Sequence, residues 1–317
     1  MIDVVAIGEL LIDFNEERKV DGYSDLLAHP GGAPANFLAP IAKYGLKTSL
    51  ISNVGDDAFG KQLVKTLKEN KIGTNNITYD KNAFTTLAFV TLDEKGDRSF
   101  SFSRKPGADT RIQYKNINLK EIDNCKVFHF GTLSLTDNPS KETTYKLIKY
   151  AKSKKKIISF DPNLRENLWN NLSDAKKQML YGLRNAYIVK ISDYEVKFLF
   201  KIKPEKAVDY ILNKFHNIKL IYVTCGNKGC YYGTRNIKGY LPSMKGIKVV
   251  DTTGAGDIFG GSAMFKFLKL NKDINLLTEK DLYKIVKFAT ISAGLSTTKY
   301  GGLKSVTPYK NISKYIK

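Results

Sequence analysis

The stretch D-T-T-G-A-G-D-I-F-G-G at residues 251–261 decides the fold, because it joins a glycine-rich turn to an apolar helical pattern that runs to Leu270. Residues 247–250 read as a β-type run, so a strand, a turn and a helix are expected in succession. The first N–H groups of a helix lack intrahelical acceptors and carry the positive end of the helix dipole. Gly254, Ala255 and Gly256 therefore predict an anion-binding site with little side-chain obstruction.

Asp257 places a carboxylate at the edge of this predicted anion site. The pair suits the transfer of an anionic group to a hydroxyl, because the amides can hold the anion while the carboxylate takes the proton. The position of Asp257 beside a helix N-terminus also predicts a lowered pKa for its carboxyl group.

Two familiar nucleotide-binding motifs do not fit the same stretch. Residues 256–262 match G-x-x-x-x-G-S, but a P-loop needs lysine where this chain has Gly261. Gly254 and Gly256 begin a G-x-G, yet Phe259 takes the place of the third glycine and no acidic ribose partner follows at the right distance. The sequence therefore predicts neither a Walker A site nor a dinucleotide fold.

Composition places the chain among globular proteins, with 42% hydrophobic and 26% charged residues in 317. No apolar run reaches the roughly 18 residues of a membrane span, and residues 1–8 do not resemble a signal peptide. The three cysteines form no even disulfide set, and the three histidines are scattered. We expect a cytoplasmic protein with buried thiols, no membrane partner and no histidine-based metal site.

The formal net charge of +20 makes nucleic-acid binding an alternative function to consider. The lysines are spread over the whole chain, however, and the densest run, residues 152–156, contains no aromatic side chain. Such runs are usually solvated faces, so no nucleic-acid partner is predicted. A nucleic-acid-binding protein would instead show steeply salt-dependent affinity for DNA or RNA.

Strand and helix patterns alternate along most of the chain. Strands are expected at residues 4–8, 48–54, 126–130, 157–160, 186–191 and 218–224, and helices at 61–70, 140–154 and 281–296. This order predicts an α/β fold whose mostly parallel sheet is covered by helices on both faces. Ligands in such folds bind at the carboxyl ends of the strands, where the motif residues fall.

Residues 84–92 and 98–104 alternate in polarity around residues 93–97 and predict a long hairpin. Phe100 and Phe102 point to one face of it. A hairpin cannot bury a core alone, so this face must cover a ligand, pack on the main domain or meet a second subunit. With residues 10–15 it would form a small lid sheet. Asp13 is then either a solvent-facing strand residue or a hydroxyl acceptor in a sugar pocket.

The sequence P-G-G-A-P-A-N at residues 30–36 precedes another helical run. Its glycines allow close backbone approach, and Pro34 is tolerated in a first helical turn. Asn36 can donate and accept hydrogen bonds, as a polyol ligand requires. A loop with a capped helix start is the structural alternative.

These motifs together resemble the ribokinase-like sugar kinases, the PfkB carbohydrate kinases, over essentially the whole chain, with fructokinases the most similar members. The resemblance is carried by G-E-L-L-I-D at residues 8–13, G-G-A-P-A-N at 31–36, F-S-F-S-R-K-P-G-A-D at 100–109, F-H-F-G at 128–131, F-D-P-N-L-R at 160–165, and the D-T-T-G-A-G-D stretch. It implies one ribokinase-like three-layer α/β/α domain over residues 1–317, with a small β-sheet lid formed by about residues 10–30 and 84–106.

The resemblance further implies transfer of the γ-phosphoryl group of Mg-ATP to a sugar hydroxyl, with fructose 6-phosphate as the expected product. In a loose phosphoryl transfer the hydroxyl loses its proton late, so an oriented and ionised carboxylate is a sufficient base. Other sugars, namely 2-keto-3-deoxygluconate and ribose, remain alternatives, as does a non-catalytic sugar- or nucleotide-binding protein. Potassium as a second cation and a homodimer formed through the lid are also expected.

Site residues follow from the resemblance position by position. Asp257 would be the base and the amides of Gly254, Ala255, Gly256 and Asp257 the anion hole. Asp13, Gly31, Gly32, Asn36, Arg104, Asn163 and Arg165 would line or border the sugar pocket. Lys190, Glu195, Thr224, Gly226, Gly229, Gly256 and Thr290 would serve the nucleotide, with Glu195 acting indirectly on magnesium and Asp251 and Thr253 on a monovalent cation.

Three positions depart from the family pattern. Ser192 stands where many members have asparagine in N-x-x-E, although fructokinase-like members often have serine. Thr290 stands where an asparagine often contacts the base, which leaves the choice between ATP and GTP open. Pro40 interrupts a helix that usually carries aliphatic residues, and the sequence offers no functional reason for it.

Overall fold

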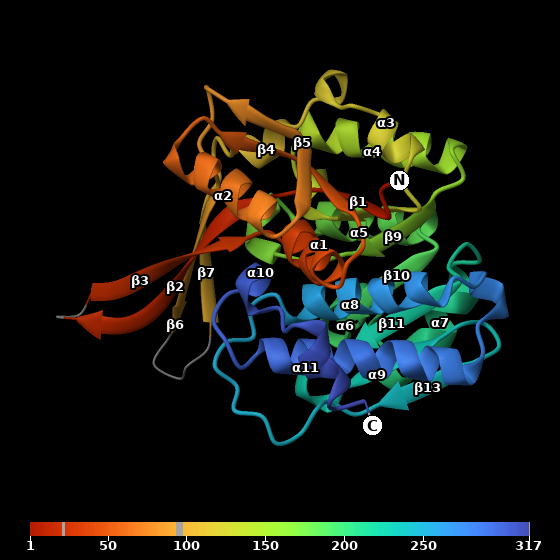
Figure 1. Ribbon diagram of the computed structural model, residues 1–317. Coiled ribbons are helices and arrows are strands. Elements are labelled where there is room, and N and C mark those ends of the chain that lie inside the picture. The colour runs from red at the N-terminus through yellow and green to blue at the C-terminus, as the bar shows by residue number, and fades with distance from the viewer. Residues whose placement is uncertain (21–22, 93–97, 317) are drawn as a thin grey trace.

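The computed structural model describes residues 1–20, 23–92 and 98–316, in which a large sheet and a small sheet are formed (Figure 1). The large sheet has the strand order β13-β12-β11-β10-β9-β8-β1-β4-β5. Its neighbours are parallel from β5 to β11, and the hairpin of β12 and β13 adds an antiparallel edge. The bounds are β1 Val4–Ile7, β4 Thr48–Gly55, β5 Ile72–Asp80, β8 Val127–Gly131, β9 Ile157–Asp161, β10 Ile188–Ser192, β11 Leu220–Thr224, β12 Cys230–Gly233 and β13 Lys238–Leu241.

Helices cover both faces of the large sheet, because its strands are apolar on both sides. On β1, Val4 and Ala6 enter one hydrophobic core while Val5 and Ile7 enter the other. The first core takes residues from α1 Ala33–Lys43, α2 Ala58–Glu69, α8 Ala255–Leu270 and α9 Glu279–Ser296, and the second from α4 Ser140–Ser153, α5 Leu172–Asn185, α6 Asp193–Phe200 and α7 Ala207–Lys214. Short helices α3 Lys120–Asp123, α10 Gly302–Ser305 and α11 Tyr309–Ser313 complete the chain. The predicted three-layer α/β/α fold is confirmed.

The small sheet, here called the lid sheet, has the order β3-β2-β6-β7 and projects from the body of the protein (Figure 1). Its strands are β2 Leu11–Val20, β3 Tyr23–Gly31, β6 Leu87–Leu92 and β7 Arg98–Ser103. Phe14 stacks on Phe89 at 5.3 Å between ring centroids and meets Phe59 of α2 edge to face at 5.9 Å. The face of the lid sheet that carries Phe14 and Phe89 therefore packs on the main body. The opposite face is left to cover the site. Residues 93–97 of the predicted hairpin and the side chain of Phe100 lie outside the described residues.

The expected strand at residues 247–250 is wrong. The large sheet already ends at β13, so this run has no strand to pair with and passes over the end of α9 instead. The Val250 N–H donates to the Thr297 carbonyl at 2.7 Å, and the side chains of Val249 and Val250 are exposed. The β-branched residues here therefore lie in an irregular segment outside the sheet.

Strand β5 was not predicted. Its sequence, I-G-T-N-N-I-T-Y-D, shows no apolar alternation, and it forms the edge of the large sheet beside β4. Asn76 on this edge strand is buried and donates to the Glu121 carboxylate at 2.8 Å, so polar contacts replace the apolar pattern.

The cysteines occupy the interior, as predicted. Cys125, Cys225 and Cys230 are all free and buried. Cys225 belongs to the core on one face of the large sheet and Cys230 to the core on the other.

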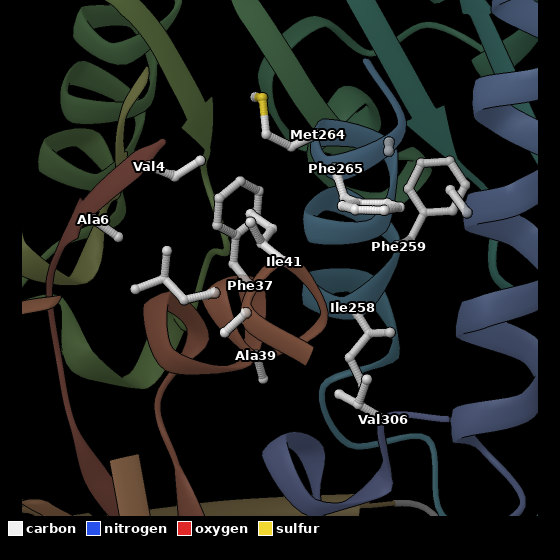
Figure 2. Close-up of a cluster of buried hydrophobic side chains, with 14 of the residues drawn as sticks. Val4, Ala6, Phe37, Ala39, Ile41, Ile258, Phe259, Met264, Phe265 and Val306 are labelled. Carbon is white, nitrogen blue, oxygen red and sulfur yellow. The ribbon is translucent and has the colours of Figure 1, made fainter. Parts of the chain in front are cut away.

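Helices α1 and α8 approach each other very closely, and glycine makes this possible. A Cβ atom on Gly261 would lie 2.0 Å from the Phe37 carbonyl oxygen and 2.8 Å from Cγ of Pro40. Figure 2 shows Phe37 and Ile41 of α1 directed between β1 and α8, near Met264. Pro40 thus has a packing role, since its ring lies against a glycine.

We expect Gly261→Ala to lower the free energy of unfolding by about 3 kcal/mol, because the added methyl group overlaps backbone that cannot move aside easily. Gly260→Ala is the matched control in the same helix turn, since its Cβ would meet only the Phe37 ring, at 3.3 Å. Denaturant unfolding followed by circular dichroism measures both. Equal stability of the two variants would contradict the proposed contact.

Candidate active site

Two adjoining cavities lie at the carboxyl ends of the central strands, on either side of the start of α8. The first, here called the lid cavity, measures 330 Å³ and includes Leu11, Asp13 and Phe102 of the lid sheet in its wall. The second, here called the apolar cavity, measures 570 Å³ and is lined by Met244, Ile247, Val249 and Phe259 among others. The two cavities share the residues Lys190, Ser192, Thr252 and Gly256. The two cavities therefore adjoin along these four residues.

The first turn of α8 begins at Gly254, whose φ of 73° is left-handed. A Cβ atom there would lie 2.8 Å from Gly302 Cα and 3.0 Å from Nδ2 of Asn36, so only glycine fits. The Ala255 N–H already donates to the Thr252 carbonyl at 3.2 Å. Of the amides predicted for the anion site, that of Ala255 is therefore already engaged within the turn.

Two asparagine amides hold the Asp257 carboxylate. Nδ2 of Asn36 donates to Oδ2 at 3.1 Å, and Nδ2 of Asn163 donates to Oδ1 at 2.8 Å. Burial raises the pKa of Asp257, although Lys190, Arg165 and the two amides act in the opposite direction. The lowered pKa expected from the helix dipole is therefore wrong, because desolvation of the buried carboxylate outweighs it.

Lys190 lies beneath the first turn of α8. Its Nζ is 3.0 Å from Oδ2 of Asp161, and a Cβ atom on Gly256 would also lie 3.0 Å from this nitrogen. Burial alone would lower the pKa of Lys190, but Asp161, Glu195 and Asp257 together raise it. The ammonium group thus stays charged at the boundary between the two cavities.

Both carboxylate oxygens of Glu195 accept hydrogen bonds from backbone amides. Oε1 accepts from the Leu164 N–H at 2.8 Å and Oε2 from the Ser192 N–H at 2.8 Å. The Glu195 N–H in turn donates to the Ser192 hydroxyl at 3.2 Å, which makes a capping box at the start of α6. Serine therefore performs the N-cap role that asparagine would have here.

Asp251 organises the loop before α8. Its Oδ1 accepts from the N–H and the hydroxyl of Thr253 at 2.9 and 2.7 Å, and its Oδ2 accepts from the Gly301 N–H at 2.9 Å. Nδ2 of Asn15, on lid strand β2, lies 3.5 Å from the same Oδ2. Among the described residues, no cluster of three or more His, Cys, Asp and Glu side chains is suited to a metal ion.

Most of the residues predicted for the sugar pocket meet in the lid cavity. They are Asp13, Gly32, Asn36, Asn163, Arg165 and Asp257. Gly31 lies behind Asp13, because a Cβ atom on it would be 2.0 Å from Oδ2 of Asp13. Burial, reinforced by Asp257 and Asp251 and opposed by Arg165, raises the pKa of Asp13 to about 7. Of the two alternatives for Asp13, the structure favours the residue of the pocket over the solvent-facing strand residue, because Asp13 lines the cavity.

Arg104 is not among the residues that line the lid cavity in the described chain. Its Nε and Nη2 donate to Oδ2 of Asp109 at 2.8 and 2.6 Å, and Nη2 also donates to the Leu133 carbonyl at 3.0 Å. Nη1 donates to the Thr136 hydroxyl at 2.8 Å. The buried guanidinium thus anchors the chain that follows β7.

The residues predicted for the nucleotide meet in the apolar cavity. Lys190, Thr224, Gly226, Gly229, Gly256 and Thr290 all line it, whereas Glu195 lines the lid cavity. Oγ1 of Thr290 is buried and has no hydrogen-bond partner within the described part of the chain. The segment at residues 247–250 supplies Ile247 and Val249 to the same wall.

Glu9 is a site residue that the sequence did not predict, although it belongs to the motif at residues 8–13. The Glu9 carboxylate accepts from the Ala33 N–H at 2.8 Å, so it caps α1 in place of the side chain that Gly32 lacks. Burial raises its pKa to about 7, and it lines the lid cavity. An acidic residue directly after a buried strand was the available signal.

The family model described as pfkB family carbohydrate kinase matches residues 1–308. The chain belongs to this family of sugar phosphotransferases. The kinase is 38% identical over 312 residues to fructokinase-2 of Solanum lycopersicum, a match that covers 96% of this chain and 92% of the relative.

Solved structures agree with this assignment. Fructokinase of Xylella fastidiosa with bound ATP superimposes with a TM-score of 0.90 at 28% identity, over 100% of this chain and 98% of that one. A double mutant of fructokinase from Vibrio cholerae O395, bound to fructose, ADP and potassium ion, gives 0.87 at 29% identity, over 100% and 99%. No helix in the described ranges of the kinase has the length and hydropathy to cross a membrane.

We expect Arg104→Ala to lower the free energy of unfolding by about 3–5 kcal/mol, because it leaves the Asp109 carboxylate buried without its partner. Arg111→Ala is the control, since its ion pair with Asp80 is half exposed and should contribute at most about 1 kcal/mol. Denaturant unfolding gives both values. An Arg104→Ala variant of normal stability whose KM for sugar alone is raised would instead indicate a direct sugar contact.

Proposed function

We propose that this kinase is an ATP-dependent fructokinase, which converts fructose to fructose 6-phosphate. The observation that carries the proposal is the position of Asp257 at the start of α8, where a polar cavity under the lid sheet meets an apolar cavity. The relatives and solved structures named above are fructokinases, which supports fructose as the sugar.

In this proposal fructose occupies the lid cavity and ATP the apolar cavity. The sugar hydroxyl oxygen attacks the γ-phosphorus while the bond from that phosphorus to the β,γ-bridging oxygen breaks, so that ADP leaves. The hydroxyl proton passes to Asp257. Because the transition state is loose, the protein contributes mainly position and electrostatic stabilisation.

The shared boundary of the cavities supplies the stabilising charges. The amides of Gly256 and Asp257 face the transferred group at the positive end of α8. The Lys190 ammonium lies directly below them and keeps its charge through its acidic neighbours. These groups balance the negative charge on the phosphoryl oxygens while the phosphoryl group passes from ADP to the sugar.

Two cations complete the proposal. Glu195 has both oxygens engaged by backbone N–H groups, so it would act on Mg²⁺ through bound water, in keeping with the ion's preference for water ligands. The Asp251 carboxylate and Thr253 hydroxyl are oxygen donors suited to a hard cation such as potassium. These ions would neutralise phosphate charge and support the loop before α8.

The sugar is tested by a coupled assay of ADP release with fructose, 2-keto-3-deoxygluconate and ribose, each with ATP and with GTP. We expect the highest kcat/KM for fructose with ATP. A higher value for either of the other sugars would reassign the substrate, and binding without turnover of any of them would make this a non-catalytic binding protein.

A lid-to-lid homodimer in the cytoplasm remains our proposal for its assembly and location. On the outer lid strand β3, Tyr23 is 81% exposed and Leu27 is 44% exposed, which suits a contact between copies. Sedimentation equilibrium tests the assembly, and a monomer at micromolar concentration would refute it.

We expect Asp257→Asn to lower kcat by about 10²–10⁴-fold, because the variant keeps the shape of the side chain but cannot accept the hydroxyl proton. The KM values for sugar and ATP should change little, since the neighbouring donors stay in place. Steady-state kinetics with both substrates, after thermal unfolding has shown an intact fold, measures this. Near-normal turnover would remove Asp257 from the role of base.

A further inference from the structure

We propose that Asn163 is a positioning residue, which fixes the Asp257 carboxylate in the orientation needed to take the proton. This inference rests on the proposed kinase function. It assigns to Asn163 a role other than the sugar contact that the sequence suggests, because the side-chain amide is directed at the carboxylate itself.

The backbone of Asn163 is the first observation. The residue follows β9, is 8% exposed and has a φ of 47°, which lies in the left-handed region that side chains with a Cβ rarely adopt. Nδ2 donates to Oδ1 of Asp257 at 2.8 Å. A backbone conformation that few residues other than glycine and asparagine adopt therefore coincides with a specific contact to the predicted base.

The residues on both sides of Asn163 are tied to the main body. The Pro162 carbonyl accepts from the N–H and the hydroxyl of Thr132 at 3.2 and 2.5 Å. The Leu164 N–H donates to Oε1 of Glu195 at 2.8 Å. These bonds hold the loop from before and after, so the left-handed residue between them cannot relax without breaking one.

The Asp257 carboxylate is thereby held at both oxygens. Asn36 of α1 donates to Oδ2 at 3.1 Å and Asn163 donates to Oδ1. Two donors on different oxygens fix the plane of the carboxylate, whereas one would leave it free to rotate. Asp257 also lines the lid cavity, where the sugar hydroxyl would lie.

Several charged groups also face Asp257. They are Lys190 on β10 and Arg165 after β9, which favour the ionised form, and Asp13 on β2 and Asp161 on β9, which disfavour it. The substitution of Asn163 leaves all four in place. A change in the titration of Asp257 can therefore be assigned to the lost amide.

The left-handed backbone allows a sharp test with Asn163→Gly and Asn163→Ala. Glycine removes the amide and tolerates the backbone, whereas alanine removes the amide and strains it. Asn271→Gly is the matched control, since Asn271 has a φ of 48° and lies exposed at the end of α8. The measurements are kcat, the KM of fructose, and kcat/KM as a function of pH.

We expect Asn163→Gly to lower kcat roughly 10- to 100-fold while the KM of fructose stays within about threefold, since a hydrogen bond to a charged group is lost. The acid limb of kcat/KM should move to higher pH by about one unit, because the ionised carboxylate loses a donor. Asn163→Ala should show the same shift, and Asn271→Gly neither change.

Two results would overturn the inference. A raised KM of fructose with unchanged kcat and an unmoved acid limb would make Asn163 a sugar ligand. An active Asn163→Gly beside an impaired Asn163→Ala would mean that only the backbone conformation matters.

A second readout does not depend on turnover. Infrared titration of the Asp257 carboxylate, with its band assigned by Asp257→Asn, should give a higher pKa in Asn163→Gly than in the unmodified chain. An equal pKa would refute the role of Asn163. A chain that phosphorylates no sugar, yet shows the pKa difference, would refute the proposed function and leave this contact standing.

Discussion

The close approach of α1 to the start of α8 is the constraint on which the rest of the site depends. A Cβ atom on Gly302 would lie 2.3 Å from Oδ1 of Asn36, and one on Gly254 would lie 3.0 Å from its Nδ2. Asn36 therefore fits only between two glycines, and its amide then reaches Asp257. The same packing of two helices places the base and the two cavities around it.

The architecture was largely predictable from the sequence. Strands β1, β8, β9, β10 and β11 were found because each is largely buried on both faces and contains a short run rich in apolar residues. Strand β4 is also buried, although its sequence T-S-L-I-S-N-V-G is mostly polar. Glycine-rich turns after these strands marked the motif residues, so most of the predicted sugar and nucleotide positions do meet in two adjoining cavities. The predictions failed for β5 and for residues 247–250, where contacts with neighbouring segments decide whether a strand forms.

The direction of the Asp257 pKa shift and the hydrogen-bond partners of Arg104 and Asn163 could not be predicted from the sequence. The helix dipole predicted a lowered pKa for Asp257, but the depth of burial, which is set by distant segments, reverses the direction. Arg104 was assigned to the sugar pocket from its motif, yet its guanidinium is bound to Asp109, five residues along the chain, and to carbonyl and hydroxyl groups near residue 135. The pairing of Asn163 with Asp257 joins residues 94 positions apart, which no spacing rule would find.

The three buried cysteines have a consequence for the chemistry of the whole protein. Burial raises the pKa of Cys125 and Cys225 to about 11 and raises that of Cys230 as well. Thiols react with oxidants as thiolates, so all three remain in their unreactive form at neutral pH. Cys225 and Cys230 flank the turn at Gly226 and Gly229, and they belong to the cores on opposite faces of the sheet. The turn at Gly226 and Gly229, which lines the apolar cavity, therefore has no thiolate from these cysteines beside it at neutral pH.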